Sequence, residues 1–290
     1  MSTTTATLPD TLTLGAAALT VSDVDRSAAF YEDVIGLDTL ARGEGRATMG
    51  SGDRPVLELV ADPDATPAGR EAGLYHVALL YPSREELAHV AQRLVASRTP
   101  VQGASDHHTH EAFYLPDPDG NGLELAADRP REQWPDLQDA YDLTKGAPQP
   151  LDVADLMRLV DGQPVVARAE PGVRVGHLHL HVGDVDQGLA FYRDVIGFDE
   201  IANMDTAAFV SAAGYHHHLG FNTWRGEGVP PAGEGRLGLR EWTVLLPDAD
   251  VAAVRERVAA AGIDTDDRPA GGFTVLDPWR NALAIEPGRR

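Results

Sequence analysis

The chain contains no cysteine among its 290 residues. A protein without thiols has no disulfide, no thiolate nucleophile and no cysteine-ligated zinc, so any metal must be held by His, Asp or Glu. No stretch approaches the roughly 18 apolar residues that cross a bilayer, and the N-terminal segment lacks the basic and apolar regions of a signal peptide. We therefore expect a cytoplasmic protein.

Positive charge is also scarce, because 24 Lys and Arg residues stand against 45 Asp and Glu residues, for a formal net charge of -21. Such a chain repels nucleic acids and anionic lipids, so we expect neither a nucleic acid nor a membrane as partner. With 43% hydrophobic and 24% charged residues, the composition is that of a globular protein with one large core or two ordinary ones.

An internal repeat is visible without gaps. The stretch "VSDVDRSAAFYEDVIGL" from Val21 aligns with "VGDVDQGLAFYRDVIGF" from Val182. In both copies Asp precedes apolar residues at helical spacing and Gly follows them, which predicts a capped amphipathic helix after a strand. A second pair, "FYLPDPDGNGLELAAD" from Phe113 and "FTVLDPWRNALAIEPG" from Phe273, predicts a strand, a tight turn and a final strand.

These repeats predict an α+β fold of four modules, each ordered strand, helix and three strands (βαβββ). The modules are placed at residues 12–60, 73–128, 173–223 and 238–287. The intervening segment 129–171 is rich in Asp and Pro and contains a helical pattern at "DVADLMRLV", so we interpret it as a linker between the halves.

A fourfold βαβββ repeat with helices such as "SAAFYEDVIGL" resembles the vicinal oxygen chelate superfamily, which includes extradiol dioxygenases, glyoxalase I and bleomycin resistance proteins. The stretches "GLYHVALL", "DPDGNGLELAADRPREQW", "GHLHLHV" and "GYHHHLGFNTW" are most similar to its catechol 2,3-dioxygenase branch in bacilli and related bacteria. The resemblance covers nearly the whole chain and implies two half-barrel domains of the metal-chelating type. Fold alone does not decide function, because this superfamily hosts several chemistries.

The resemblance also implies where metal ligands lie, at the start of a module's first strand and in its last strand. The second module has His76 and Glu124 at these positions, and the third has His177 at the first of them. The first and fourth modules carry other residues at the first-strand position, Ala16 and Glu241. Two imidazoles and one carboxylate form the facial set of non-haem Fe(II) oxygenases, so we expect Fe(II), with Mn(II) as the alternative, between the second and third modules.

Acid–base residues follow from the same resemblance. It assigns proton transfer to His217 in "HHLGF", a role that suits imidazole because its pKa is near neutrality. It assigns a hydrogen bond with a substrate oxygen to Tyr114, ten residues before Glu124. A further His precedes this Tyr in the family, and we favour His107 for it.

Neighbouring histidines have simpler interpretations. Two other members of "SDHHTHEAFY", His108 and His110, are left without a role. A strand through "GYHHHLGF" would turn His216 and His218 away from the face that carries the central histidine of the three, where they would be supporting or structural.

The function that this reading predicts is an extradiol ring-cleaving dioxygenase acting on catechol or a substituted catechol with O2. Its partners would be the aromatic diol, O2 and, as members of the superfamily often assemble, further copies of this chain. One alternative is a glyoxalase-like metal-dependent isomerase or lyase, which normally needs a second carboxylate where this chain has Gly220. Another is a metal-free small-molecule binding protein, which would bury two imidazoles and a carboxylate without an ion at a cost in stability.

Overall fold

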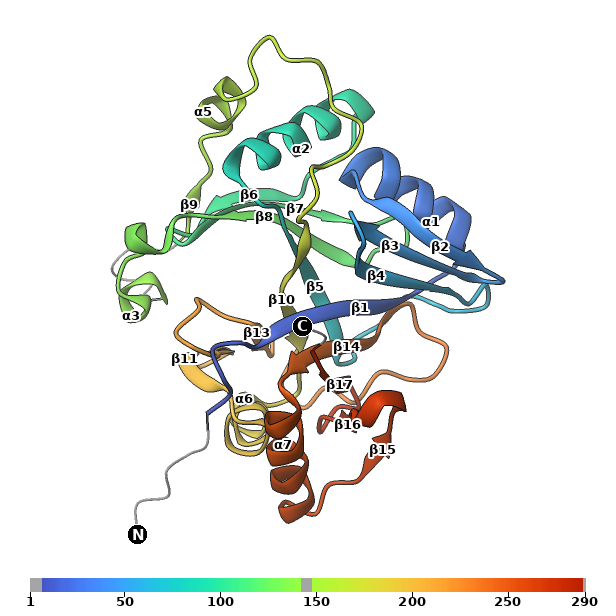
Figure 1. Cartoon of the computed structure of the whole chain (residues 1–290), viewed down its shortest axis with the longest axis vertical. Coiled ribbons are helices and arrows are strands. Elements are labelled where there is room, and N and C mark those ends of the chain that lie inside the picture. The colour runs from blue at the N-terminus through green and yellow to red at the C-terminus, as the bar shows by residue number, and fades with distance from the viewer. Residues whose placement is uncertain (1–6, 142–147, 289–290) are drawn as a thin grey trace.

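The computed structural model describes residues 7–141 and 148–288, so residues 142–147 of the expected linker lie outside the described part. Within this part the strands form two sheets, ordered β15-β16-β17-β14-β1-β4-β3-β2 and β11-β12-β13-β10-β5-β8-β7-β6-β9 (Figure 1). The strands of the first sheet are β1 (Thr13–Val21), β2 (Asp38–Gly43), β3 (Arg46–Ser51), β4 (Arg54–Ala61), β14 (Gly238–Leu246), β15 (Thr265–Asp267), β16 (Phe273–Leu276) and β17 (Ala282–Pro287). Those of the second are β5 (Gly73–Leu80), β6 (Gly103–Asp106), β7 (His110–Pro116), β8 (Gly122–Asp128), β9 (Gln149–Pro150), β10 (Arg174–His181), β11 (Asp199–Met204), β12 (Ala207–Ser211) and β13 (Leu219–Asn222). The predicted α+β fold of repeated βαβββ units is confirmed.

Each sheet joins strands from two distant repeats. The first and last repeats share one sheet through the antiparallel pair β1 and β14, and the second and third share the other through β5 and β10. Inside each repeat the first strand lies parallel to the last strand, as β5 does to β8. The two sheets therefore draw on both halves of the chain.

The helices are α1 (Val24–Phe30), α2 (Arg84–Ser97), α3 (Leu137–Tyr141), α5 (Val153–Arg158), α6 (Val185–Leu189) and α7 (Asp248–Ala260), with π-helical turns η1 (Tyr31–Ile35) and η3 (Ala190–Ile196) and 3-10 turns η2 (Arg131–Gln133) and η4 (Pro269–Gly271). The Asp23 and Asp184 side chains accept hydrogen bonds from the first-turn N–H groups of α1 and α6, which confirms the expected caps. Gly36 and Gly197 end the two helices with left-handed backbone, at φ 88° and 102°. In the described ranges, none of the helices has the length and apolar character to span a membrane.

The helices pair within each half of the chain, whereas the sheets pair across the halves. Figure 1 shows α1 beside α2 at one end of the molecule and α6 beside α7 at the other. Buried Arg93 of α2 donates to the carbonyl oxygens of Val34 and Ile35, and Arg257 of α7 donates to those of the equivalent residues in η3. These arginines satisfy carbonyl groups at the ends of the helices that the π-helical turns leave open.

Two buried aspartates connect the sheets at the Asp-Pro turns. Asp117, before β8, accepts hydrogen bonds from the backbone N–H and side-chain amide of Asn121 and, at 3.1 Å, from the Tyr31 hydroxyl of the other sheet's helix. Asp277, before β17, repeats this arrangement with a 2.8 Å hydrogen bond from Tyr192. Both tyrosines belong to the aligned stretches that begin at Val21 and Val182, and both aspartates to those that begin at Phe113 and Phe273. The two kinds of aligned stretch therefore contact each other in the fold.

Replacing Asp277 by Ala should lower the free energy of unfolding by about 3 kcal/mol, because it leaves a buried hydroxyl and several turn N–H groups without an acceptor. Urea denaturation followed by circular dichroism measures the change. The matched variant Tyr192→Phe removes one of these hydrogen bonds and should cost about 1 kcal/mol. A cost below about 1 kcal/mol for Asp277→Ala would show that the turn does not depend on this carboxylate.

Candidate metal centre

Three predicted ligands meet on the concave face of the second sheet. His76 lies on β5, Glu124 on the adjacent parallel strand β8, and His177 on β10, the antiparallel neighbour of β5. The Nε2 atoms of His76 and His177 lie 3.0 and 3.1 Å from Glu124 Oε2, and all three residues are buried. One ligand atom from each lies within 4.8 Å of the other two.

The hydrogen bonding of this set indicates whether a cation fits it. Nε2 of His76 is buried and, within the described residues, has no hydrogen-bond partner, because its approach to Glu124 Oε2 does not have hydrogen-bond geometry. Such a nitrogen is costly to bury unless something binds it. Two imidazole nitrogens and a carboxylate oxygen aimed at one point fit a divalent transition metal, which would satisfy all three.

Charge in the site is compatible with a bound cation. Burial alone would raise the pKa of the Glu124 carboxyl, but the neighbouring imidazoles, His177 foremost, hold this pKa well below its usual value. Burial lowers the pKa of His177 against the opposing effect of Glu124. At neutral pH the site therefore presents an ionised carboxylate and a neutral imidazole, the forms that coordinate a metal.

Tyr114 and His107 lie together beside the ligands. Tyr114 on β7 is the direct cross-strand partner of Glu124, and its ring lies 5.7 Å from that of His76. Its hydroxyl oxygen is 2.7 Å from His107 Nε2. Burial raises the pKa of Tyr114 well above its usual value, and it lowers the pKa of His107 to about 3. The pair is thus a neutral phenol against a neutral imidazole.

His217 reaches the site from the loop that precedes β13. Its ring lies 4.0 Å from the ring of His177, and its Nδ1 atom is 2.7 Å from the hydroxyl oxygen of Tyr141. Burial lowers the pKa of His217 well below its usual value, with His177 and His216 adding to the effect. A neutral imidazole, fixed at one nitrogen, lies directly beside the ligand set.

The expected strand through "GYHHHLGF" is wrong in its first half. Ala213 and Gly214 have positive φ angles of 53° and 62°, and β13 begins only at Leu219. Because the histidines lie in a loop, alternation does not apply to them, and His216 faces the site instead of turning away. Only His218 is directed elsewhere, where its Nδ1 lies 2.9 Å from the Ser211 hydroxyl.

His216 joins the site to a carboxylate nearer the surface. Its Nδ1 lies 3.0 Å from His217 Nδ1, and its Nε2 lies 3.2 Å from Asp128 Oδ1. The other Asp128 oxygen accepts a 2.8 Å hydrogen bond from Tyr215. The Asp128 side chain is 21% exposed, so a continuous polar path leads from His217 toward solvent.

His110 is the site residue that the sequence interpretation passed over in favour of a neighbour. Its Nε2 is 2.9 Å from Glu124 Oε1, and its ring is stacked between those of His107 and His216 at 4.5 and 4.6 Å. Alternation along β7 places residues 110, 112 and 114 on one face, a signal that could have identified His110 beside Tyr114. Nothing comparable marked Tyr141, which lies in the segment interpreted as a linker.

The strand face that carries His177 continues with two further histidines. Asn222 donates to His179 Nε2 through its amide nitrogen and accepts from His181 Nδ1 through its oxygen, both at 2.9 Å. His179 is the cross-strand partner of His76, and the two rings lie 5.2 Å apart. Asn222 thus fixes two imidazoles at the side of the ligand set.

The corresponding face of the first sheet contains an arginine. The repeat alignment places Glu241 at the position of His76, and Arg268 Nη1 donates to both Glu241 oxygens at 2.8 and 2.7 Å. Arg268 Nε donates to Glu286 at 2.6 Å. A guanidinium between two carboxylates thus occupies this face, and the described residues form no three-ligand cluster there.

Comparisons with known proteins give the same fold. Residues 13–125 and 174–285 match the Glyoxalase/Bleomycin resistance protein/Dioxygenase superfamily. A Bacillus subtilis (strain 168) protein named catechol-2,3-dioxygenase is 39% identical over 276 residues, which cover 93% of this chain and 95% of that protein.

Solved structures agree on the fold at low identity. One from Bacillus subtilis subsp. subtilis str. 168 has a TM-score of 0.67 at 14% identity and covers 98% of this chain and 87% of its own. Glyoxalase I from Zea mays has a TM-score of 0.60 at 16% identity, covering 96% and 92%. These likenesses concern the fold alone.

The proposed ligand set predicts that Glu124→Gln lowers the bound divalent metal, loaded as Fe(II) or Mn(II), by about tenfold or more, because it removes the anionic donor of the set while keeping the side-chain shape. Metal analysis after anaerobic loading and gel filtration measures the content. His89→Gln, which changes a buried histidine of α2 outside the site, should leave it unchanged. Equal metal content in the two variants would exclude this centre.

Proposed function

Because the chain belongs to the glyoxalase/bleomycin resistance protein/dioxygenase superfamily, we propose that it is an extradiol ring-cleaving dioxygenase that acts on catechol or a substituted catechol with O2. The observation that carries the proposal is the position of His217 against His177, with Tyr114 beside Glu124 in the same site. The name of the relative at 39% identity supports the same activity. Neither acid–base group belongs to the proposed ligand set of His76, Glu124 and His177.

In this proposal His76, His177 and Glu124 hold Fe(II), or Mn(II) in its place. The metal would bring the diol and O2 together and carry electrons between them. The protein's other residues then have to orient the diol and move its protons. The three proposed ligands and His217 are buried, so bulk water does not compete for their hydrogen bonds.

His217 is the proposed base. A neutral imidazole can accept a proton from a diol hydroxyl at Nε2, while its Nδ1 remains near Tyr141 and His216. The proton would later return from the same nitrogen to the opening ring. This return restores the neutral imidazole, whose Nδ1 side is linked through His216 to Asp128.

Tyr114 is the proposed orienting group. With the proton of His107 on Nε2, the imidazole donates to the phenol oxygen and leaves the phenol proton for a substrate oxygen. The raised pKa of Tyr114 keeps that proton in place at neutral pH. A fixed donor of this kind is most useful where negative charge develops on the substrate oxygen.

Glyoxalase-like isomerase or lyase chemistry is less well supported. It would use a second carboxylate at position 220, but a Cβ atom on Gly220 would lie 3.1 Å from the ring of His179 and from that of Phe209. A glutamate does not fit there without moving both rings. A metal-free binding protein would leave Nε2 of His76 buried without a partner.

The proposal predicts that Fe(II)-loaded protein consumes O2 with catechol or a methyl- or chloro-substituted catechol and forms a yellow ring-opened product. His217→Phe should retain iron and lower kcat by about a hundredfold or more, because it removes the base but keeps a ring against His177. An oxygen electrode and absorbance spectra measure the two signals.

His108→Asn is the matched control for this variant. His108 lies in the β6–β7 turn at φ 64°, a conformation that Asn tolerates, and its ring has no contact with the ligand set among the described residues. The control should react like the unchanged protein. Normal turnover by His217→Phe would disprove the catalytic assignment, and iron binding without O2 uptake on any diol would turn attention to isomerase or lyase substrates.

Tyr114 and His107 should behave as one unit. Tyr114→Phe and His107→Phe should each lower kcat/KM by about tenfold, and the double variant should lose little more than either single variant, since one hydrogen-bonded pair is broken in every case. Steady-state kinetics of the four proteins gives the coupling. Fully additive losses would mean that His107 does not act through the tyrosine.

A further inference from the structure

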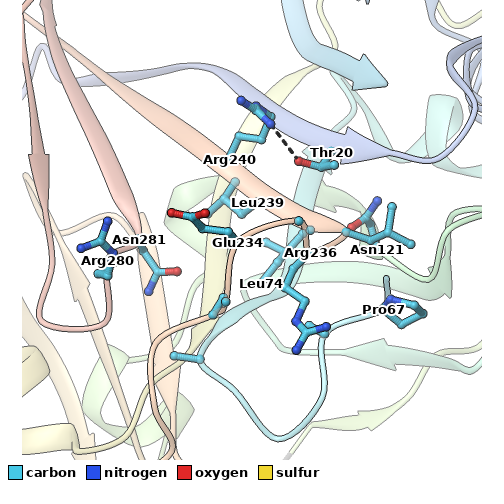
Figure 2. Close-up of a pocket in the computed structure, with 18 of the residues that line it drawn as sticks. Thr20, Pro67, Leu74, Asn121, Glu234, Arg236, Leu239, Arg240, Arg280 and Asn281 are labelled. Carbon is cyan, nitrogen blue, oxygen red and sulfur yellow. Dashed lines mark hydrogen bonds between the residues drawn. The ribbon is translucent and has the colours of Figure 1, made fainter. Parts of the chain in front are cut away.

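A pocket of about 510 Å³ lies outside the metal centre (Figure 2). Loops and strand ends from both halves of the chain line it, among them Thr20, Pro67, Leu74, Arg236 and Asn281. Its lining residues include none of the proposed ligands or acid–base groups. The volume is in the range of small-molecule sites.

The pocket lies between two equivalent turns of the repeat. One wall is the turn before β8, with Gly120 and Asn121, and the opposite wall is the turn before β17, with Arg280 and Asn281. The repeat therefore provides similar backbone on the two sides. The side chains on these walls are not similar, because Arg280 stands where the other turn has Gly120.

Four arginines line this pocket, which we call the arginine pocket: Arg225, Arg236, Arg240 and Arg280. All four come from the C-terminal half of the chain. Its lining contains two carboxylates, Asp119 and Glu234, and the first of these is already paired with Arg26. Such a concentration of cations is unexpected in a chain with a net charge of -21.

Two of these four cations have no carboxylate partner among the residues that the structure describes. Arg236 is paired with Glu71 at 2.9 Å, and Arg225 donates to the backbone carbonyl of the same Glu71 and lies within the electrostatic influence of its carboxylate. Within the described residues, Arg240 donates to the Thr20 hydroxyl at 3.3 Å and has no ion pair. Arg280 has no hydrogen bond or ion pair in the described ranges 7–141 and 148–288. Acidic residues outnumber basic ones almost twofold, so the chain contains enough carboxylates to pair with every arginine.

Arg280 also adopts an unfavourable backbone conformation. Its φ is 66°, and the equivalent Gly120 has a φ of 87°, a region that glycine occupies without penalty and arginine does not. A side chain that persists at such a position at a cost in stability suggests a function for that side chain. Figure 2 shows Arg280 beside Asn281, on the side of the pocket away from Asn121.

We propose that the arginine pocket binds a small organic polyanion, a molecule with two or more carboxylate or phosphate groups. Guanidinium groups bind both kinds of anion through paired N–H donors. Figure 2 shows the guanidinium groups of Arg236, Arg240 and Arg280 on different sides of the pocket, so a ligand with separated charges fits better than a single small anion. The proposal does not depend on the activity of the metal centre.

Titration calorimetry of the full metal-loaded protein in 150 mM salt tests the proposal with two weakly chelating probes, tricarballylate and fructose 1,6-bisphosphate. At least one should bind with a Kd below about 1 mM. Tighter binding of the first identifies a carboxylate ligand, and tighter binding of the second identifies a phosphate ligand. Acetate and inorganic phosphate should bind much more weakly than either.

Two substitutions that change the charge of the pocket in opposite directions make the test specific. Arg280→Gly installs the residue of the equivalent turn and should weaken binding by about tenfold while leaving the melting temperature of the unliganded protein unchanged or higher. Glu234→Gln removes a lining carboxylate that has no ion pair among the described residues, and it should tighten binding severalfold. The control Arg98→Gly removes an exposed arginine at φ 55° from the end of α2 and should change nothing.

The proposal is overturned if neither probe binds with a Kd below about 1 mM, or if Arg280→Gly binds like the unchanged protein. Equal weakening by Arg98→Gly would also overturn it, because net charge would then account for the effect and not the pocket.

Discussion

The antiparallel pairing of β5 with β10 is the constraint on which the site depends. It places His179 opposite His76 and His177 opposite Ala78, while the parallel strand β8 brings Glu124 beside the same Ala78. The proposed ligands from two repeats thereby meet around one carboxylate. Because strand pairing fixes which side chains share a face, a slip of one residue in this register would turn the histidines of β10 to the opposite face of the sheet.

The two sheets share a duplicated backbone arrangement but carry different charged side chains on their equivalent faces. In the second sheet a carboxylate lies among imidazoles, and in the first a guanidinium, Arg268, lies between Glu241 and Glu286. A largely buried charge must be compensated in either case, since an isolated one is costly to remove from water. The first sheet compensates its carboxylates with a side chain, whereas the second leaves an imidazole nitrogen that a cation can satisfy. The turns differ in the same way, with Gly120 in one and Arg280 in the other.

Three stacked histidine rings contact the proposed functional groups of the site. The stacked rings of His107, His110 and His216 each contact a different group of the site: the Tyr114 hydroxyl, the Glu124 carboxylate and the His217 imidazole. Stacking fixes the planes of the rings, and the hydrogen bonds fix which atoms meet. Burial lowers the pKa values of His107 and His216 to about 3, so these two imidazoles remain neutral at pH 7 and do not repel each other as cations would.

Features that depend on residues close in the chain could be predicted from the sequence. Local backbone geometry accounts for helix caps such as Asp23, for the turn around Asp117 and for the alternation that sets Tyr114 beside Glu124. Because the sequence is repeated, the same local patterns could be recognised at more than one place in the chain. The positions of His216 and Tyr141 in the site became visible only in the tertiary structure. A loop with left-handed residues turned His216 inward, and long-range packing brought Tyr141 to His217, because neither position obeys a strand or helix period that a sequence pattern could reveal.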